Sequence, residues 1–362
     1  MTGIFIASTA PRAGKSLVAF SLGVLLQKAG LSVGYMKPLG RIPQKKDELT
    51  GDADALVVQE VLGQSEAADV VSPLMLPQNQ HALALAPGMS GAEALRRIRE
   101  GYAKISAGKD ITLVSGAGAY PAAGRFADAD GLTLTRELGL RVLMVERYAG
   151  HINYDELLLL KDMLGDALIG VIINDVPENE TRDVGRILKP WLESRGLAVY
   201  GILGHEPGLT AMRVADLAYG LNGRIVAGNK WASGMVNGFL IGTMQVDNFM
   251  MHLRRREDCA VIVGGDRSDL QLAALHARTP CIILTGNMAP SELIRSKAEE
   301  MGVTLIMVRE DTYSIARIMS RILRSKKLRD LSQIRLAVSL VESSLDVGGV
   351  LGALGLECDS SA

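Results

Sequence analysis

A short stretch near the N-terminus has the composition of a phosphate-binding loop. It runs from Ser8 to Ser16 and reads STAPRAGKS. In such a loop, backbone N–H groups and the start of the following helix surround phosphate oxygens. The lysine reaches the outer phosphates, and the serine hydroxyl can ligate Mg²⁺. The alternative is an ordinary strand-to-helix turn that ends in a surface lysine.

The expected roles within this stretch follow from that chemistry. Lys15 is the expected catalytic cation, and Ser16 is the expected metal ligand. The residues expected to contact the nucleotide here are Thr9, Ala13, Gly14, Lys15, Ser16 and Leu17.

The flanking sequence supplies the elements that such a loop needs. Residues 4–7 are apolar and strand-like, and residues 17–28 have a helical pattern. The strict loop pattern has glycine five residues before Gly14, where this chain has Thr9. Despite that departure, strand, loop and helix together favour nucleotide or phosphate binding.

Further polar residues follow the next predicted strand, residues 32–36. Lys37 would lie at the same sheet edge as Lys15 and could hold a carboxylate, a carbamate or a terminal phosphate, or it is simply an exposed lysine. Asp52 and Asp54 precede a helical segment, 55–62. They are candidate Mg²⁺ ligands, although Asp52 is equally suited to cap that helix.

Two other strand ends carry candidate residues. The strand at 111–114 runs into Ser115 and a glycine-containing turn, where phosphate-loop enzymes usually have an acid that helps to hold the metal. A serine there argues against efficient phosphoryl transfer. Asn174 ends the strand at 169–173, where its amide could contact a nucleobase or simply occupy a turn.

The second half of the chain contains a smaller α/β pattern. Its strands are predicted at 260–263, 281–284 and 304–308, with helices at 268–278 and 290–301. Polar, glycine-containing turns end the first two strands, and they are either a small-molecule or anion pocket, an interface, or plain turns. The candidate pocket residues are Asp266, Arg267, Thr285 and Gly286.

Composition limits the classes of function. The chain has 362 residues, a formal net charge of −1 and 48% hydrophobic residues, and only 4% of the chain is aromatic. We therefore expect no nucleic-acid or membrane partner. The widely spaced Cys259, Cys281 and Cys358, together with a start that lacks a signal-like segment, suggest a cytoplasmic protein. The five histidines have no metal-ligand spacing and are expected to be structural or exposed.

Alternating strands and helices predict an α/β protein with a parallel sheet, in which the loop lies at the carboxyl ends of the strands. We expect a P-loop nucleotide-binding domain at 1–212, a smaller α/β domain at 213–326, and a C-terminal helix and tail at 327–362.

The first of these domains resembles the dethiobiotin synthetase branch of phosphate-loop proteins, which also includes cobyrinic acid a,c-diamide synthases. The matching features are the loop at Ser8 to Ser16, Lys37-Pro38, Asp54, the Ser-Gly-Ala-Gly strand end at 115–118, and Asn174. The second domain resembles a DRTGG domain through Gly265-Asp266-Arg267 and Thr285-Gly286-Asn287. This order is similar to the amino-terminal half of long bacterial phosphate acetyltransferases.

The resemblance implies ATP and Mg²⁺ as cofactors. It implies that Asp54 assists the metal, that Lys37 faces a substrate or the γ-phosphate, that Asn174 contacts adenine, and that the protein is a homodimer. The synthetases have glutamate where this chain has Ser115, and the DRTGG pattern has glycine at Asn287. The chain ends where an acetyltransferase domain would follow, so we do not expect acetyl-phosphate chemistry.

Two functions remain open from the sequence. The first is an ATP-binding regulatory or sensor protein, whose second domain mediates assembly or senses a ligand. The second is an ATP-dependent ligase of the dethiobiotin synthetase or cobyrinic acid a,c-diamide synthase type, in which Lys15 and Lys37 stabilise charge during transfer to a carboxylate or carbamate. Whether the chain is an enzyme depends on the missing acid at Ser115.

Overall fold

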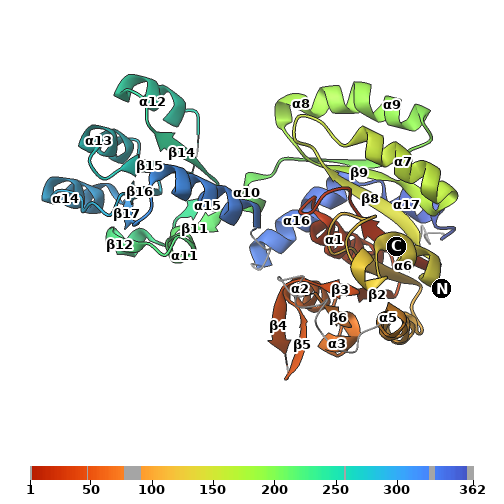
Figure 1. Cartoon of the computed structure of the whole chain (residues 1–362). Coiled ribbons are helices and arrows are strands. Elements are labelled where there is room, and N and C mark those ends of the chain that lie inside the picture. The colour runs from red at the N-terminus through yellow and green to blue at the C-terminus, as the bar shows by residue number, and fades with distance from the viewer. Residues whose placement is uncertain (1, 47, 77–90, 257, 326–330, 357–362) are drawn as a thin grey trace. The chain divides into compact units, whose positions relative to one another are not determined.

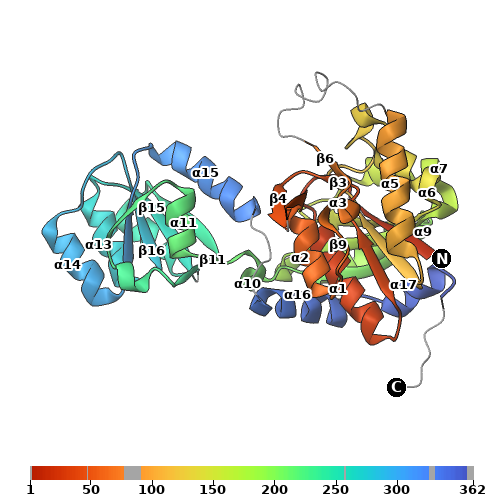
Figure 2. The same ribbon diagram turned by 90° about the horizontal axis from the view of Figure 1, so that it is seen from below.

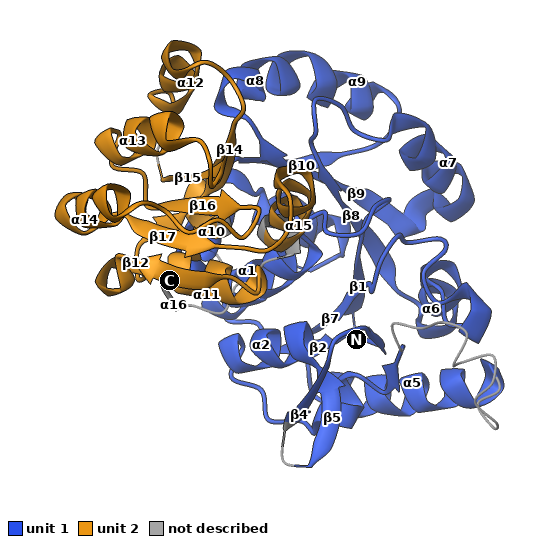
Figure 3. Ribbon diagram, turned by 60° about the vertical axis from the view of Figure 1, so that its left-hand side comes forward, with its two compact units in different colours: residues 1–205, 328–362 blue, residues 206–327 orange. Residues whose placement is uncertain are grey.

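The computed structural model describes residues 2–46, 48–76, 91–256, 258–325 and 331–356 (Figure 1). The chain forms two compact units (Figure 3): Met1–His205 with Leu328–Ala362, and Glu206–Lys327. The α/β class predicted from the sequence is confirmed. The domain limits proposed from the sequence stay a prediction, and Cys358 lies outside the described residues.

A parallel sheet of six strands organises the first unit, in the order β10-β9-β8-β1-β7-β2. These strands are β1 (Thr2–Ala7), β2 (Val33–Met36), β7 (Ile111–Ser115), β8 (Arg141–Arg147), β9 (Leu168–Val176) and β10 (Val199–Gly204). β1 pairs with both β7 and β8, so the segment that follows β1 emerges between the ends of two neighbouring strands. That is where a parallel sheet places a ligand site.

Helices cover both faces of this sheet, which is why its strands are mostly apolar. Figure 1 shows α7 (Tyr154–Leu164), α8 (Glu178–Asp183) and α9 (Lys189–Ser194) on one face, and α1 (Lys15–Lys28) with α16 (Leu331–Ser344) on the other. α16 contacts both α1 and β10, and α17 (Val347–Ala353) contacts α1 and β10 as well (Figure 2). The last helices of the chain therefore belong to the first unit.

Smaller elements of the first unit lie beside the carboxyl edge. β3 (Leu39–Gly40) pairs with β6 (Leu74–Met75), and β4 (Pro43–Lys46) forms a hairpin with β5 (Leu49–Asp52). Further helices of this unit include α2 (Ala53–Val61), α3 (Ala68–Val71), α5 (Gly91–Ser106) and α6 (Gly131–Leu138). β5 leads directly into α2, so Asp52 becomes the residue that caps this helix.

The second unit contains a five-stranded sheet in the order β12-β17-β16-β15-β14. Its strands are β12 (Arg224–Ala227), which is antiparallel to β17, β14 (Gly238–Gly242), β15 (Cys259–Gly264), β16 (Cys281–Thr285) and β17 (Thr304–Met307). Its helices include α11 (Val214–Gly220), α12 (Val246–Leu253), α13 (Ser268–His276), α14 (Glu292–Met301) and α15 (Thr312–Ser325).

Both faces of this second sheet are buried. Val261 and Val263 of β15 join a cluster with side chains of α12, α13 and α14, whereas Ala260 and Ile262 join one with side chains of α11 and α15. Because alternate residues of a strand face opposite sides, this burial on both faces explains the unbroken apolar run in the sequence.

Within the described residues, no helix combines the length and the apolar character needed to cross a bilayer.

Candidate nucleotide-binding site

The loop between β1 and α1 has the backbone geometry that its sequence predicts. Gly14 has a φ of 109°, in the left-handed region that favours glycine. A Cβ atom at this position would also collide with the side-chain amide of Asn174. Glycine is therefore required at position 14 for both conformation and space, and helix α1 begins at the next residue.

Lys15 lies buried inside the loop, with 7% of its surface exposed. Its ammonium group donates to Ser8 Oγ at 2.5 Å and to the carbonyl oxygen of Gly118 at 3.0 Å. Burial lowers the pKa of Lys15 from 10.5 to about 8. The Glu146 carboxylate opposes that change, and the positive charges of Lys37 and Arg41 add to it. The cation is therefore held at the carboxyl edge in an electropositive setting.

Glu146 holds the first part of the loop, and sequence reasoning missed it. It lies near the end of β8, is 3% exposed, and accepts hydrogen bonds from Thr9 N at 2.7 Å and from Thr9 Oγ1 at 2.6 Å. Burial raises the pKa of this carboxyl, partly offset by the bonds from Thr9. The available signal was an acid directly after the buried run at residues 142–145, on a strand expected beside the loop.

Asn174 contacts the loop directly. Its Nδ2 donates to the carbonyl oxygen of Ala13 at 2.9 Å, across a long separation in sequence. The side chain thus fixes the backbone just before Gly14. Contact between Asn174 and a nucleobase stays a prediction.

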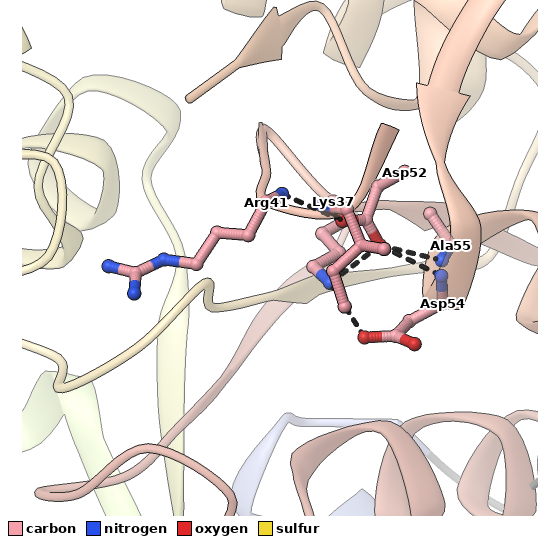
Figure 4. A network of polar contacts seen from close by, with 6 residues as sticks. Lys37, Arg41, Asp52, Asp54 and Ala55 are labelled. Carbon is pink, nitrogen blue, oxygen red and sulfur yellow. Dashed lines mark hydrogen bonds and ion pairs between the residues drawn. The ribbon is translucent and has the colours of Figure 1, made fainter. Parts of the chain in front are cut away.

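A second lysine is buried at the end of β2 (Figure 4). Lys37 Nζ lies 2.7 Å from Asp52 Oδ1 and 3.3 Å from Asp54 Oδ2. Asp52 also accepts four backbone N–H bonds, from Arg41, Ile42, Asp54 and Ala55. Burial would raise the pKa of Asp52, but the Lys37 charge and these bonds outweigh it, so the pKa is lowered.

This network separates the roles of the two aspartates. Asp52 is fully buried and acts as the N-cap of α2, so all of its lone pairs are used within the protein. Asp54 stays partly exposed while it pairs with Lys37. Of the two, only Asp54 remains a candidate metal ligand.

Ser115 lies at the end of β7, beside β1, with 1% of its surface exposed. Its hydroxyl faces that of the buried Tyr35. Because Ser115 and Tyr35 are both uncharged, neither of them offers a carboxylate to a metal at this strand end. The following residues, 116–120, line a small pocket together with Phe5, Pro38 and Leu39.

The residues present fit a Mg²⁺–nucleotide better than a bare metal ion. Within the described parts of the chain, no group of three or more His, Cys, Asp or Glu side chains could hold a metal. Magnesium commonly binds through one or two protein oxygens together with substrate phosphates and water. Half-buried Ser16, in the first turn of α1, and Asp54 could supply such oxygens.

Comparison with known proteins agrees with this geometry. A family model described as AAA domain matches residues 2–213. The chain belongs to the AAA domain family. A second model, described as DRTGG domain, matches residues 216–322.

Two individual proteins are similar to this chain over different lengths. The AAA domain is similar to an ATP-dependent dethiobiotin synthetase of Pseudomonas aeruginosa, with 34% identity over 195 residues that cover 50% of this chain and 81% of that protein. A phosphate acetyltransferase of Nitratidesulfovibrio vulgaris is 23% identical over 95% of this chain and 50% of its own length. The chain thus spans about half the length of such acetyltransferases, and the resemblance predicted from the sequence is confirmed.

Among solved structures, the MinD cell division protein of Aquifex aeolicus is similar at a TM-score of 0.36 and 16% identity. The match covers 58% of this chain and 84% of that one.

The AAA domain also carries a charged group that the sequence analysis did not single out. Asp175 has a φ of 65° and lies between the Arg147 guanidinium and the His205 imidazole. Its carboxylate is 2.5 Å from Arg147 Nη2 and 2.6 Å from His205 Nδ1. Arg147 ends β8, Asp175 is the second-last residue of β9, and His205 directly follows β10, so the group lies beside Asn174 at the same edge of the sheet.

In the DRTGG domain, the two predicted turns do lie together. Gly264 pairs with Thr285 at the ends of the adjacent strands β15 and β16. The Arg267 guanidinium bonds the neighbouring Asp269 at 2.8 Å, and Thr285 Oγ1 lies 2.9 Å from Thr312 Oγ1. Asn287 adopts a φ of 55°, so an asparagine takes the left-handed conformation where the DRTGG pattern has glycine. A ligand at Asp266, Arg267, Thr285 and Gly286 stays a prediction.

Proposed function

We propose that the AAA domain binds ATP together with Mg²⁺ at the loop Ser8 to Ser16, and that the chain is a nucleotide-binding regulatory or sensor protein. One observation carries the proposal. The loop has Gly14 in a left-handed conformation and presents Lys15 at the first residue of α1. A helix N-terminus with a lysine at that point is suited to bind the outer phosphates of a nucleotide.

The acids around this loop support a regulatory role over rapid phosphoryl transfer. Both carboxylate oxygens of Glu146 accept hydrogen bonds from Thr9. The Asp52 carboxylate is already paired with Lys37 and caps α2. Ser115 brings no charge to the strand end beside the loop. Binding with slow turnover fits this arrangement, because few carboxylates are available to position a metal for transfer.

The DRTGG domain would then convert nucleotide binding into a response. It would do so by mediating assembly, as a homodimer or with a partner protein, or by sensing a second ligand. The domain suits this role because its Gly264–Arg267 and Thr285–Asn287 turns gather polar groups at one sheet edge.

An ATP-dependent ligase is the second candidate, and it is favoured by Lys37. This lysine is 5% exposed and fixed between two aspartates at the edge that carries Lys15. Two fixed cations could stabilise negative charge that develops during transfer to a carboxylate or carbamate.

Calorimetric titration of ATP, with and without Mg²⁺, alongside measurement of phosphate release, separates the candidates. Wild type is compared with Lys15→Ala. The regulatory proposal expects Mg²⁺-dependent binding that the variant loses, with phosphate release near background. Rapid Mg²⁺-dependent turnover that Lys15→Ala abolishes would reject it in favour of an enzyme. Absence of binding to wild type would reject both.

The variant Ser115→Glu tests the reason for slow turnover. A carboxylate at this strand end should raise Mg²⁺ affinity in the presence of ATP. The matched variant Ser115→Gln has the same size without the charge, and it should not. Equal effects of the two variants would show that charge at position 115 does not limit metal binding.

A further inference from the structure

An open cleft lies at one edge of the six-stranded sheet and includes none of the residues placed at the nucleotide site. It is lined by residues 199–202 of β10, the edge strand of the sheet. Lys189, the first residue of α9, lines it as well, together with Ser343, Ser344 and Asp346 around the turn from α16 to α17. Its volume is about 360 Å³, which is within the range of small-molecule sites.

The backbone of the edge strand is already paired at this place. Asp346 N donates to the carbonyl oxygen of Tyr200 at 2.7 Å, and Gly201 forms an antiparallel bridge with Leu345. A Cβ atom on Gly201 would lie 3.0 Å from the carbonyl oxygen of Ser344, so the returning chain lies close against the strand. An extended peptide therefore cannot add here as a further strand, and the cleft suits a compact ligand that binds through side chains.

The two charged side chains of the cleft have opposite signs, and neither is tightly paired. Lys189 Nζ lies 3.8 Å from Glu193 Oε1, which is beyond hydrogen-bond distance, and the Lys189 side chain is 42% exposed. Asp346 is exposed and accepts a hydrogen bond from Gly349 N at 2.8 Å. Within the described parts of the chain, no cationic side chain pairs with Asp346. Both charges are therefore available to a ligand.

Hydroxyl groups add hydrogen-bonding capacity to the cleft. Ser344 Oγ lies 3.4 Å from Ser343 Oγ, which is long for a bond between two hydroxyls. Burial and the nearby Asp346 carboxylate raise the pKa of Tyr200, which also lines the cleft. Its hydroxyl therefore keeps its proton at neutral pH and can act as a donor.

The placement of the charges narrows the ligand. Lys189 comes from α9 and Asp346 from the end of α16, and these two helices cover opposite faces of the sheet (Figure 1). A ligand with two carboxylates would bring one of them toward Asp346, and a ligand with two ammonium groups would bring one toward Lys189. A molecule with one carboxylate and one ammonium group at opposite ends avoids both repulsions.

We propose that the cleft beside β10 binds a small zwitterion, an amino acid whose charged groups lie at opposite ends of a short chain. Its carboxylate pairs with Lys189 and its ammonium group with Asp346, while the Tyr200 and Ser344 hydroxyls bond its polar ends. The site shares no residue with the proposed nucleotide site, so it stands or fails independently of that function.

The test uses the full chain and probes that share one four-carbon backbone: 4-aminobutanoate, succinate and 1,4-diaminobutane. Each is titrated by ligand-observed NMR into wild type, Lys189→Met, Lys189→Glu and Asp346→Asn, the last of which keeps an oxygen that can cap α17. Lys104→Met is the control, because Lys104 is an exposed lysine of the same unit. Circular dichroism checks that each variant is folded.

We expect wild type to bind 4-aminobutanoate about tenfold more tightly than either other probe. Lys189→Met and Asp346→Asn should each weaken that binding about tenfold, as loss of a charge-assisted hydrogen bond requires. Lys189→Glu should reverse the preference toward 1,4-diaminobutane, which a merely structural change would not do. Lys104→Met should stay within about twofold of wild type.

The inference is overturned if 4-aminobutanoate does not bind wild type, or if wild type binds all of the probes equally. It is also overturned if Lys189→Met and Asp346→Asn leave the affinity unchanged, or if Lys104→Met weakens binding as much as they do. Because Lys189→Glu tests a gain of preference, the site stays testable even if Asp346→Asn unfolds α17. A folded Lys189→Glu protein that keeps the wild-type preference rejects the site.

Discussion

The Glu146 carboxylate accepts two hydrogen bonds from Thr9, one from the backbone N–H at 2.7 Å and one from the hydroxyl at 2.6 Å. Glu146 lies on β8, and Thr9 lies just beyond the end of β1, the strand that pairs with β8 in parallel. Both are nearly inaccessible to solvent. The loop is therefore fixed at its start by Glu146 and near its end by Asn174, before any ligand binds.

The first prediction concerns stability and the protonation of Glu146. Burial raises the pKa of this carboxyl above its ordinary value of 4.5. As pH rises past that value, the unfolded chain loses the proton first, so the free energy of unfolding falls until the folded pKa is passed. Glu146→Gln cannot titrate. The stability of wild type relative to this variant should therefore decrease as pH rises from 4.5 toward neutrality.

Urea unfolding of both proteins at a series of pH values measures this difference. Glu60→Gln removes an exposed carboxyl on α2 and serves as the control, for which we expect no such trend. A difference for Glu146→Gln that grows with pH would mean that Glu146 is stabilised as an anion, opposite to what its burial implies.

A second prediction follows from the pKa of Lys15, which burial lowers to about 8. Phosphate binding requires the ammonium form. Affinity for ATP should therefore decline as pH rises through about 8, while the phosphates of ATP remain ionised. Lys15→Arg keeps its charge over this range, so its weaker affinity should be nearly independent of pH. Calorimetric titrations on either side of this pH give both profiles, and parallel profiles would contradict the prediction.

A third prediction is that Lys15 lowers the stability of the free protein. Its pKa falls from 10.5 to about 8, which corresponds to an opposing free energy of about 3 kcal/mol below pH 8. Lys15→Met removes the buried charge but also loses the bonds to Ser8 and Gly118. We expect a net gain of about 1 to 2 kcal/mol in the free energy of unfolding at neutral pH, together with loss of ATP binding.

Urea unfolding without nucleotide measures that gain. The stability advantage of Lys15→Met should shrink as pH rises from 8 toward 10.5. In this range Lys15 is already neutral in the folded protein, so wild type no longer buries a charge. A variant less stable than wild type at neutral pH would show that the two hydrogen bonds outweigh burial of the charge.

The sequence predicted most of the fold because its signals are local. Strand β1, the loop and helix α1 follow from an apolar run, a glycine-lysine-serine sequence and a helical pattern that lie within one segment. The burial of β15 on both of its faces likewise follows from one apolar run.

Several site residues could not be predicted because their roles depend on contacts between distant segments. Glu146 meets Thr9 across a separation of 137 residues, and Asn174 meets Ala13 across 161. The sequence left Asp52 as either a metal ligand or a helix cap. The choice required knowing that Lys37 and the backbone of Arg41 converge on its carboxylate. Spacing alone carries no information about such convergence.

The fourth prediction tests the close approach of Gly14 and Asn174. Gly14→Ala should abolish ATP binding, because the methyl group strains a φ of 109° and collides with the Asn174 amide. The double variant Gly14→Ala/Asn174→Ala removes the collision but not the backbone strain. Calorimetry should therefore recover only part of the affinity in the double variant. Full recovery to the affinity of Asn174→Ala alone would show that space alone requires glycine, and no recovery would show that conformation alone does.

The fifth prediction concerns the buried pair of Lys37 and Asp52. Removing Asp52 leaves the Lys37 charge buried and the N–H groups at the start of α2 without their acceptor. Asp52→Ala should lower the free energy of unfolding by about 3 to 5 kcal/mol, as expected when one partner of a buried pair is lost. Asp110→Ala, which removes an exposed aspartate bonded to Ser32, should cost far less than Asp52→Ala.

A double variant separates charge from capping in this pair. Asp52→Asn retains an oxygen that can cap α2 but leaves Lys37 without its anion, and the added change Lys37→Met removes the stranded charge. Lys37→Met/Asp52→Asn should therefore be more stable than Asp52→Asn alone, by urea unfolding at neutral pH. If the added change instead destabilises the protein further, Lys37 stabilises this edge of the sheet by packing and not by its ion pair. Since the pKa of Asp52 is lowered below 3.8, the advantage of wild type over Asp52→Asn should also disappear as pH falls below that value.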